Sequence, residues 1–352
     1  MSPLAPLAPA QRVPVTLVTG FLGSGKTTLI NRLLRQSDLA DAAVIVNELG
    51  DIGIDNVLLE TVDSTTALLE SGCVCCTVRE ELAVTMQELL ERRERGEIPR
   101  FARLVIETTG MADPGPISRL LLTDPLVATR YALASVVTTV DAVNGASTLE
   151  RHVEAASQAA LADRLILTKT DLALPADADA LLTALRRVNP TAPLVRAAEE
   201  VLDGSILAGA PTDPAADAAN VSAWLRPVAD APHTHGAHDH DHHDHEAHDH
   251  LGEHDIRTFD LLREEPLSWT QVSRWLQSLG ELPGEDLLRV KGIVNVAGLP
   301  GPAIVHGVQR LIHVPAVLPS WPDGDRRTRI VCITRGIPRE RLEQLLDAAC
   351  AV

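Results

Sequence analysis

The sequence predicts an α/β protein with a mostly parallel sheet, followed by a smaller α+β domain. Short, almost continuously apolar segments alternate with helical patterns from Val13 to about Ala210, as expected for parallel strands covered by helices on both faces. Residues 211–254 break this pattern, and apolar segments and helices resume at Asp255. The 352-residue chain is also longer than a typical single domain of roughly 100–200 residues.

The first domain is expected at residues 13–210, behind a flexible tail at 1–12. Helical patterns occupy 27–36 (TTLINRLLRQ) and 80–95 (EELAVTMQELLERRER). The strand patterns of this domain are short and rich in Val, Ile, Leu and Thr. In chain order they are VPVTLV at 13–18, AAVIVN at 42–47, ARLVIE at 102–107, ASVVTTVD at 134–141, DRLILTK at 163–169 and APLVRA at 192–197.

The second domain is expected at 255–352, behind a linker at 211–254 that is rich in Ala, Pro, Asp and His. We expect this linker to be disordered, because such a segment buries too little apolar surface to offset the entropy of ordering. Helices are expected around Ser268–Leu279 and after Pro338. The strand patterns are IRTFDLL at 256–262, LLRVKGIVNV at 287–296, AIVHGVQRLIH at 303–313 and RTRIVCITRG at 327–336.

Composition excludes several classes of protein. A net charge of −17 and only eight aromatic residues argue against a nucleic-acid partner. The opening MSPLAPLAPAQR lacks the basic and apolar regions of a secretory signal, and no apolar run approaches the ~20 residues that span a membrane. Three of the five cysteines fall within 73–76, which favours a reducing compartment over a disulfide framework. We therefore expect a cytoplasmic protein without a membrane partner.

A glycine-rich motif follows the first strand. Residues 20–27 (GFLGSGKT) fit G-x-x-x-x-G-K-[ST], with a strand before and a helix after, as this phosphate-loop motif requires. Its glycines let backbone N–H groups surround phosphate oxygens, while Lys26 adds a positive charge near the β- and γ-phosphates. Thr27 would place its hydroxyl on Mg²⁺. The sequence therefore predicts a nucleotide-phosphate site.

Two further motifs bear on the nucleotide. The strand LVIE ends in Glu107, a candidate Walker B carboxylate, and Gly110 follows where its N–H could meet a γ-phosphate. Residues 168–171 (TKTD) resemble the guanine signature N-K-x-D, in which the Asp171 carboxylate would accept two hydrogen bonds from guanine that adenine cannot donate. Thr168 replaces the Asn of that signature, which weakens the case for tight guanine binding. Together these motifs predict a P-loop GTPase.

Three cysteines lie within four residues, in the segment 72–77 (GCVCCT). Thiolates at Cys73, Cys75 and Cys76 could converge on Zn²⁺ or another borderline-soft metal. Three ligands are one fewer than a closed structural zinc site has, which suits an ion that must leave again. A redox dithiol remains an alternative, although C-x-C-C is not the C-x-x-C spacing. For Cys332 and Cys350 we expect buried, free thiols.

Taken together, these motifs resemble the CobW-like metallochaperone GTPases. The C-terminal segments LLRVKGIVNVAG, AIVHGVQRLIH and RIVCITRG look like the C-terminal domain of that family. The chain has N-E-L-G-D where the family commonly has N-E-F-G-E, a conservative difference. The segments that carry the resemblance are Gly20–Thr27, Asn47–Gly50, Gly72–Cys76, Glu107–Pro114 and Thr168–Asp171.

The resemblance implies roles for particular residues. Catalysis would rest on Lys26, Thr27, Glu107 and Gly110, and tight metal binding on the three clustered cysteines, with Glu48 and Asp51 as additional candidate ligands. Weak, exchangeable metal binding is expected at His233, His235, His238, His240, His242, His243, His245, His248 and His250. The nucleotide would be bound by Gly20, Gly23, Ser24, Gly25, Lys26, Thr27, Thr28, Thr168, Lys169 and Asp171.

The resulting hypothesis is a GTPase that loads a metal and passes it to a metal-requiring client protein. GTP and Mg²⁺ would be bound in the phosphate loop, and hydrolysis would be slow because no arginine finger or catalytic Gln is recognisable. Zn²⁺ is the leading metal, with Co²⁺ for a corrin cofactor or iron as alternatives. A histidine and cysteine metal buffer with a regulatory nucleotide site is a second hypothesis, and a kinase on the same fold is a third. A homodimer is a candidate assembly.

Overall fold

The computed structural model divides into two compact units. One comprises Met1–Thr148, Ser157–Leu182 and Ala192–Asp213, and the other comprises Leu149–Ala156, Thr183–Thr191 and Pro214–Val352. We call them the nucleotide unit and the C-terminal unit. The structure describes residues 12–49, 66–71, 77–198, 202–208, 254–282, 286–309, 311–312 and 315–351.

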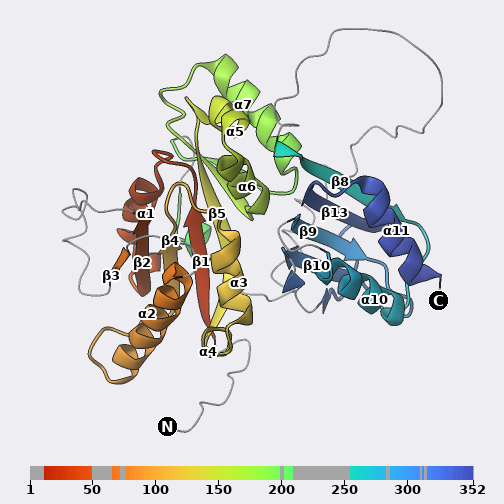
Figure 1. Cartoon of the computed structure of the whole chain (residues 1–352), viewed down its shortest axis with the longest axis horizontal. Coiled ribbons are helices and arrows are strands. Elements are labelled where there is room, and N and C mark those ends of the chain that lie inside the picture. Colours follow the sequence, from red (N-terminus) through yellow and green to blue (C-terminus); the bar gives the residue numbers. More distant parts are fainter. Residues whose placement is uncertain are drawn as a thin grey trace. The chain divides into compact units, whose positions relative to one another are not determined.

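A parallel sheet of seven strands forms the centre of the nucleotide unit, in the order β3-β2-β4-β1-β5-β6-β7 (Figure 1). All six expected strands are present, and the parallel pairing confirms the predicted class of fold. The strands are β1 (Val13–Thr19), β2 (Ala42–Leu49), β3 (Thr66–Ser71), β4 (Arg103–Glu107), β5 (Tyr131–Asp141), β6 (Arg164–Thr168) and β7 (Leu194–Arg196).

Helices connect these strands. The second expected helix begins at Thr77, three residues before the predicted start. The segments are α1 (Lys26–Leu34), a 3₁₀ turn (Ser37–Leu39), α2 (Thr77–Glu94), α3 (Gly115–Thr123), α4 (Pro125–Ala128), α5 (Gly145–Arg151), α6 (Val153–Leu161), α7 (Pro175–Val188) and α8 (Ser205–Ala208).

Both faces of this sheet are buried, because alternate residues of each strand point to opposite sides. Leu17 of β1 lies in a core with residues of α2 and α3 on one face. Its neighbour Val18 lies in a second core with residues of α1 and α8 on the other face. Apolar side chains at successive positions are therefore needed along the strand, as VPVTLV provides.

In its described residues beyond 253, the C-terminal unit consists of an antiparallel sheet of six strands and two helices (Figure 1). One face of the sheet, which includes Val290 and Cys332, packs against both helices in a single core. Trp275 is fully buried in this core. Ser268 begins the first helix with a capping box to Gln271. The elements are β8 (Ile256–Arg263), α10 (Trp269–Gly280), β9 (Leu287–Val294), β10 (Ala303–Val308), β11 (Leu311–Ile312), β12 (Ala316–Val317), β13 (Thr328–Arg335) and α11 (Arg339–Cys350).

Two expectations need correction. The segment expected as one strand at 303–313 is a turn-linked pair, because Gln309 adopts a positive φ of 52° after β10 and the chain reverses into β11. Cys332 is fully buried as expected, whereas Cys350 is only half-buried at the end of α11. Among the described residues, no helix has the length and apolar character needed to cross a membrane.

Candidate functional site: the nucleotide loops

The phosphate loop connects β1 to α1 at the carboxyl edge of the sheet. Gly20 has a φ of +143°, and a Cβ there would collide with the backbone oxygen of Thr139 on β5. Gly25 has a φ of +88° and directly precedes α1. Only glycine is tolerated at such positions without strain. The loop thus leads into the first turn of α1, and the N-terminus of a helix favours an anion.

Lys26 lies folded against this loop. Its Nζ donates to the backbone oxygens of Gly20 at 2.8 Å and Phe21 at 3.3 Å, and the residue is 8% exposed. The ammonium is therefore held at the inner side of the loop, where phosphate-loop lysines act. The role predicted for Lys26 fits this position.

Thr27 and Glu107 meet although 80 residues separate them in sequence. Thr27 Oγ1 donates to Glu107 Oε1 at 2.7 Å. Glu107 ends β4, which pairs with β1 so that Glu107 stands beside Val18, just before the phosphate loop. The structure thus brings the predicted hydroxyl and carboxylate to one point at the carboxyl edge of the sheet.

The segment after Glu107 is anchored to β1 and then turns. Thr108 donates its N–H to Val18 O at 2.9 Å and its hydroxyl to Thr19 Oγ1 at 2.9 Å. Ala112 N–H bonds Thr109 O at 3.1 Å, which closes a tight turn with Gly110 inside it. A Cβ on Gly110 would lie 2.7 Å from the Leu22 nitrogen, so this turn touches the phosphate loop. The predicted sensor glycine is therefore beside the predicted phosphate site.

Thr168 joins the expected guanine loop to the phosphate loop. Thr168 is 8% exposed. Its hydroxyl donates to Ser24 O at 2.7 Å and lies 3.3 Å from Val140 O. A threonine therefore ties the two loops together at the position where the guanine signature has asparagine.

Lys169 is fixed by a residue that the sequence analysis did not single out. It adopts a φ of 56°, and its Nζ donates to Asp141 Oδ2 at 2.7 Å. Burial of Asp141 opposes its ionisation, but hydrogen bonds from Lys169 and from the backbone N–H of Val143 outweigh that effect and lower the pKa of Asp141. Asp141 is therefore a carboxylate that holds the lysine stem beside the loop.

The remaining nucleotide residues lie around these loops. Gly23 has a φ of +71°, with no heavy atom of a described residue within 4 Å of its Cβ position. Ser24 is buried and shares a 2.7 Å hydrogen bond with Thr139 Oγ1. Thr28 is exposed on the first turn of α1, and Asp171 is exposed at the end of its loop. Asp171 is thus accessible to a ligand.

The predicted metal residues fall outside the described part of the chain. These are Cys73, Cys75, Cys76, Asp51 and the nine histidines of 233–250, while Glu48 is described only as backbone of β2. Among the described residues, no three His, Cys, Asp or Glu side chains group as a metal site. The metal site therefore stays a prediction from sequence.

Sequence reasoning missed three polar residues around the site. Thr139 and Asp141 lie at the end of the strand ASVVTTVD, and Gln158 lies on α6. A strand that ends in Asp before a helical pattern was a usable signal for Asp141. Gln158 had no signal, because its partners are 46 and 48 residues away in sequence.

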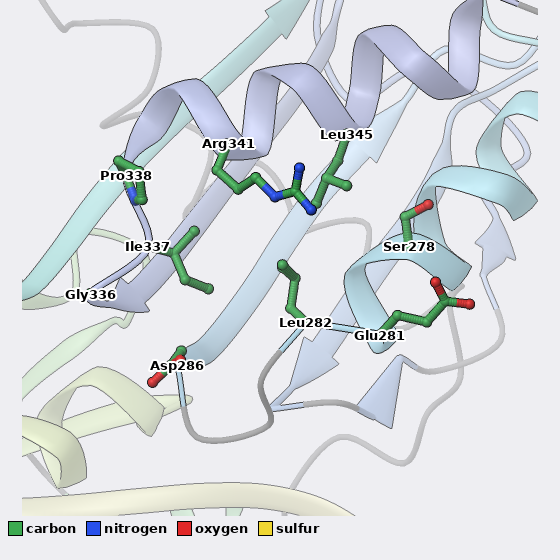
Figure 2. Close-up of a pocket in the computed structure, with 9 residues that line it drawn as sticks. All are labelled: Ser278, Glu281, Leu282, Asp286, Gly336, Ile337, Pro338, Arg341 and Leu345. Carbon is green, nitrogen blue, oxygen red and sulfur yellow. The ribbon is translucent and has the colours of Figure 1, made fainter.

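A separate pocket of about 450 Å³ lies in the C-terminal unit (Figure 2). Leu282, Ile337 and Leu345 give it apolar walls, and Figure 2 shows Arg341 extending from α11 towards Leu345. None of the predicted site residues lines it. It is therefore distinct from the nucleotide loops.

The parallel sheet, the phosphate loop and the Thr27–Glu107 pair define a P-loop protein of the GTPase type. Residues 14–196 match the family described as CobW/HypB/UreG, nucleotide-binding domain, and residues 256–350 match the cobalamin synthesis protein cobW C-terminal domain. The chain belongs to the CobW/HypB/UreG family.

Relatives match almost the whole chain. The zinc chaperone YjiA of Escherichia coli is 33% identical over 94% of this chain and 96% of its own. The zinc chaperone CobW of Pseudomonas aeruginosa is 32% identical over 98% of this chain and 94% of its own. The crystal structure of Zn(II)-bound YjiA GTPase from E. coli matches with a TM-score of 0.69 and 28% identity, covering 96% of this chain and 99% of the other.

Proposed function

We propose that this protein is a GTP-hydrolysing metallochaperone that binds Zn²⁺ at Cys73, Cys75 and Cys76 and passes it to a client protein under GTP control. The observation that supports this most is the meeting of Thr27 and Glu107 beside a complete phosphate loop. The names of the relatives, which are zinc chaperones, support zinc as the metal.

The residues present fit Mg²⁺ as the ion that accompanies GTP. A hydroxyl oxygen and a carboxylate oxygen 2.7 Å apart are hard donors of the kind that Mg²⁺ prefers. Thr27 and Glu107 would hold the ion, directly or through water, and the bound ion would neutralise charge on the β- and γ-phosphates.

The chain's own groups would orient the phosphates for hydrolysis. Backbone N–H groups of the loop at 20–25 and of the first turn of α1 would bind phosphate oxygens, and Lys26 would exchange its bonds to Gly20 O and Phe21 O for bonds to phosphate. Gly110, held beside Leu22, would face the γ-phosphate with its backbone N–H. Because no arginine finger is recognisable in the sequence, we expect intrinsic hydrolysis to be slow.

The guanine base would be recognised by the loop that follows β6. Thr168 anchors that loop to Ser24 O, and Asp141 holds Lys169, so Asp171 follows a fixed piece of backbone. Its exposed carboxylate would accept the two donors of the guanine edge.

The order of the strands supports coupling between the nucleotide and the metal. The cysteine segment connects the end of β3 to the start of α2. β3 pairs with β2, and β2 pairs with β4, so that Val46 lies between Leu68 of β3 and Glu107 of β4. Neighbouring strands are about 4.8 Å apart, which places Leu68, three residues before the end of β3, about 10 Å from Glu107.

The test is a competition titration of zinc against a chromogenic chelator, in GDP and in a non-hydrolysable GTP analogue. We expect zinc affinity to differ between the two states by at least about fivefold, the lower end of ordinary allosteric coupling. Cys75→Ser should abolish tight zinc binding and spare GTP binding, because a hydroxyl is a poor ligand for Zn²⁺. Lys26→Ala should weaken nucleotide binding and remove the difference between the states.

Equal zinc affinities in GDP and in the analogue would contradict the chaperone function. The metal buffer would then be the better explanation. The same titration with Co²⁺ compares the two candidate cargoes directly.

A further inference from the structure

Gln158 lies beneath the turn that follows Glu107. It is 1% exposed on α6, and its Nε2 lies 3.3 Å from Gly110 O and 3.0 Å from Ala112 O. The backbone oxygen of Gln158 accepts a 2.8 Å hydrogen bond from Thr138 Oγ1 of β5. One side chain, anchored to the central sheet, therefore holds two carbonyl groups of the same turn.

The geometry fixes which way the amide points. Both atoms that it meets are carbonyl oxygens, so only the NH₂ group can face them. Its Oε1 is buried and accepts no hydrogen bond from any residue that the structure describes. Leaving a buried acceptor unsatisfied is unfavourable, so the contribution of this residue lies in its donors.

The turn is thereby held between two neighbours. Gln158 binds the carbonyl of Gly110 from the side of α6, and the Cα of Gly110 abuts the Leu22 backbone of the phosphate loop. Displacement of the turn away from the phosphate loop would have to break or reform both Gln158 hydrogen bonds. The two bonds therefore favour the position in which Gly110 lies next to the phosphate site.

We infer that Gln158 is a positioning residue that sets the preference of the protein for GTP over GDP by holding Gly110 at the phosphate loop. The inference rests on the proposed function, in which Gly110 meets the γ-phosphate. GDP lacks that phosphate, so the contribution of Gln158 enters the affinity for GTP and not the affinity for GDP.

The test uses Gln158→Met, which keeps the length of the side chain and removes both donors. Affinities for GDP and for a non-hydrolysable GTP analogue are measured by calorimetry on the full chain at constant Mg²⁺. We expect the analogue to bind about tenfold more weakly, which corresponds to ~1.4 kcal/mol, and GDP to bind as in the wild type. Thr138→Val is the matched control, because it removes a buried hydrogen bond to Gln158 and leaves both bonds to the turn.

An unchanged ratio of the two affinities in Gln158→Met, or an equal change in Thr138→Val, would overturn the inference and leave the proposed function standing. A wild-type protein that bound neither guanine nucleotide would contradict the proposed function itself. Thermal unfolding checks that each variant is folded. Gln158→Asn, whose shorter amide cannot reach both carbonyls, provides the test if Gln158→Met does not fold.

Discussion

At the scale of single residues, the loop at 168–171 is held from two sides. Thr168 is bonded to Ser24 O at 2.7 Å, and Lys169 to Asp141 at 2.7 Å. A carboxylate on a backbone that is already held in place binds without the entropy cost of ordering its loop, so its hydrogen bonds contribute more fully to affinity. Asp171 is such a carboxylate, so substitutions of its side chain test which nucleotide base the protein binds.

We predict that GTP binds at least about tenfold more tightly than ATP and that Asp171→Ala removes this preference. Asp171→Asn is more diagnostic, because an amide offers one donor and one acceptor. It should shift preference from GTP towards XTP, whose base replaces the amino group of guanine by an oxygen. Titration of the three nucleotides measures the change, and equal affinities for GTP and ATP in the wild type would refute the guanine assignment.

Sequence alone predicted the residues of this site that belong to contiguous motifs. Gly20, Lys26 and Thr27 could be predicted because a phosphate loop is read from one short segment after a strand. Gln158 could not be assigned in this way, since its role arises only when separate segments meet in the folded chain.

At the scale of elements, the segment leading into β13 is stabilised by charge. Arg329 is 2% exposed, and its two terminal nitrogens donate to the two oxygens of Asp323 at 2.9 Å each. Hydrogen bonds from Arg327 lower the pKa of Asp325 to about 2. On neighbouring β8, burial raises the pKa of Asp260 against the opposing effect of Arg339. The two aspartates should therefore respond to pH in opposite senses.

We predict that Asp325→Asn lowers the free energy of unfolding at pH 7, by no more than about 1 kcal/mol because the pair is solvent-screened. The folded-state pKa of Asp325 lies below the ordinary value of 3.8, so its stabilisation is present above about pH 4 and lost as pH falls towards 2. The deficit of the variant should shrink over that range. Urea unfolding followed by circular dichroism, at pH 7 and pH 3, measures it.

Asp260→Asn is the contrasting variant. A raised pKa means that the ionised form is disfavoured in the folded state, so the variant should be as stable as the wild type or more stable at pH 7. That difference should vanish at low pH, where the carboxyl is protonated in both states. A loss of stability at pH 7 matching that of Asp325→Asn would contradict this assignment.

Strand β3 was one of the elements that sequence patterns did not predict. Its six residues, TALLES, contain only a short apolar run and no clear alternation, so the period of a strand was not visible. The strand forms because β2 offers a parallel edge over Val44–Leu49. Long strands such as β5 were predictable because they are buried along most of their length and are therefore apolar in sequence, whichever strand pairs with them.

At the scale of the whole molecule, two sheets of different kinds occur in one chain. The proposed domain limits, 13–210 and 255–352, lie close to the family matches at 14–196 and 256–350. The compact units differ slightly, since 149–156 and 183–191 group with the C-terminal unit. The histidine segment between the domains lies outside the described residues and keeps its role as a sequence prediction.

We predict that deletion of His233–His250 lowers the number of weakly bound zinc ions and leaves GTP hydrolysis and the tight zinc site unchanged. Multiple imidazoles on one segment bind metal in addition to the cysteines and contribute no group to the nucleotide loops. Zinc stoichiometry by equilibrium dialysis and a phosphate-release assay test both parts. A variant with Asn at the nine histidine positions controls for length, and loss of GTP turnover on deletion would show that the proposed domain limits are wrong.

The burial of Trp275 has an optical consequence. The four tryptophans of the chain are Trp224, Trp269, Trp275 and Trp321, so residues 13–210 contain no indole. Trp275 is fully enclosed in the C-terminal core, where emission is expected at short wavelength, while Trp269 is 39% exposed. Fluorescence excited at the red edge of the tryptophan absorption band therefore comes only from tryptophans beyond residue 210. A change in that emission on addition of GTP would therefore report on tryptophans that lie outside residues 13–210.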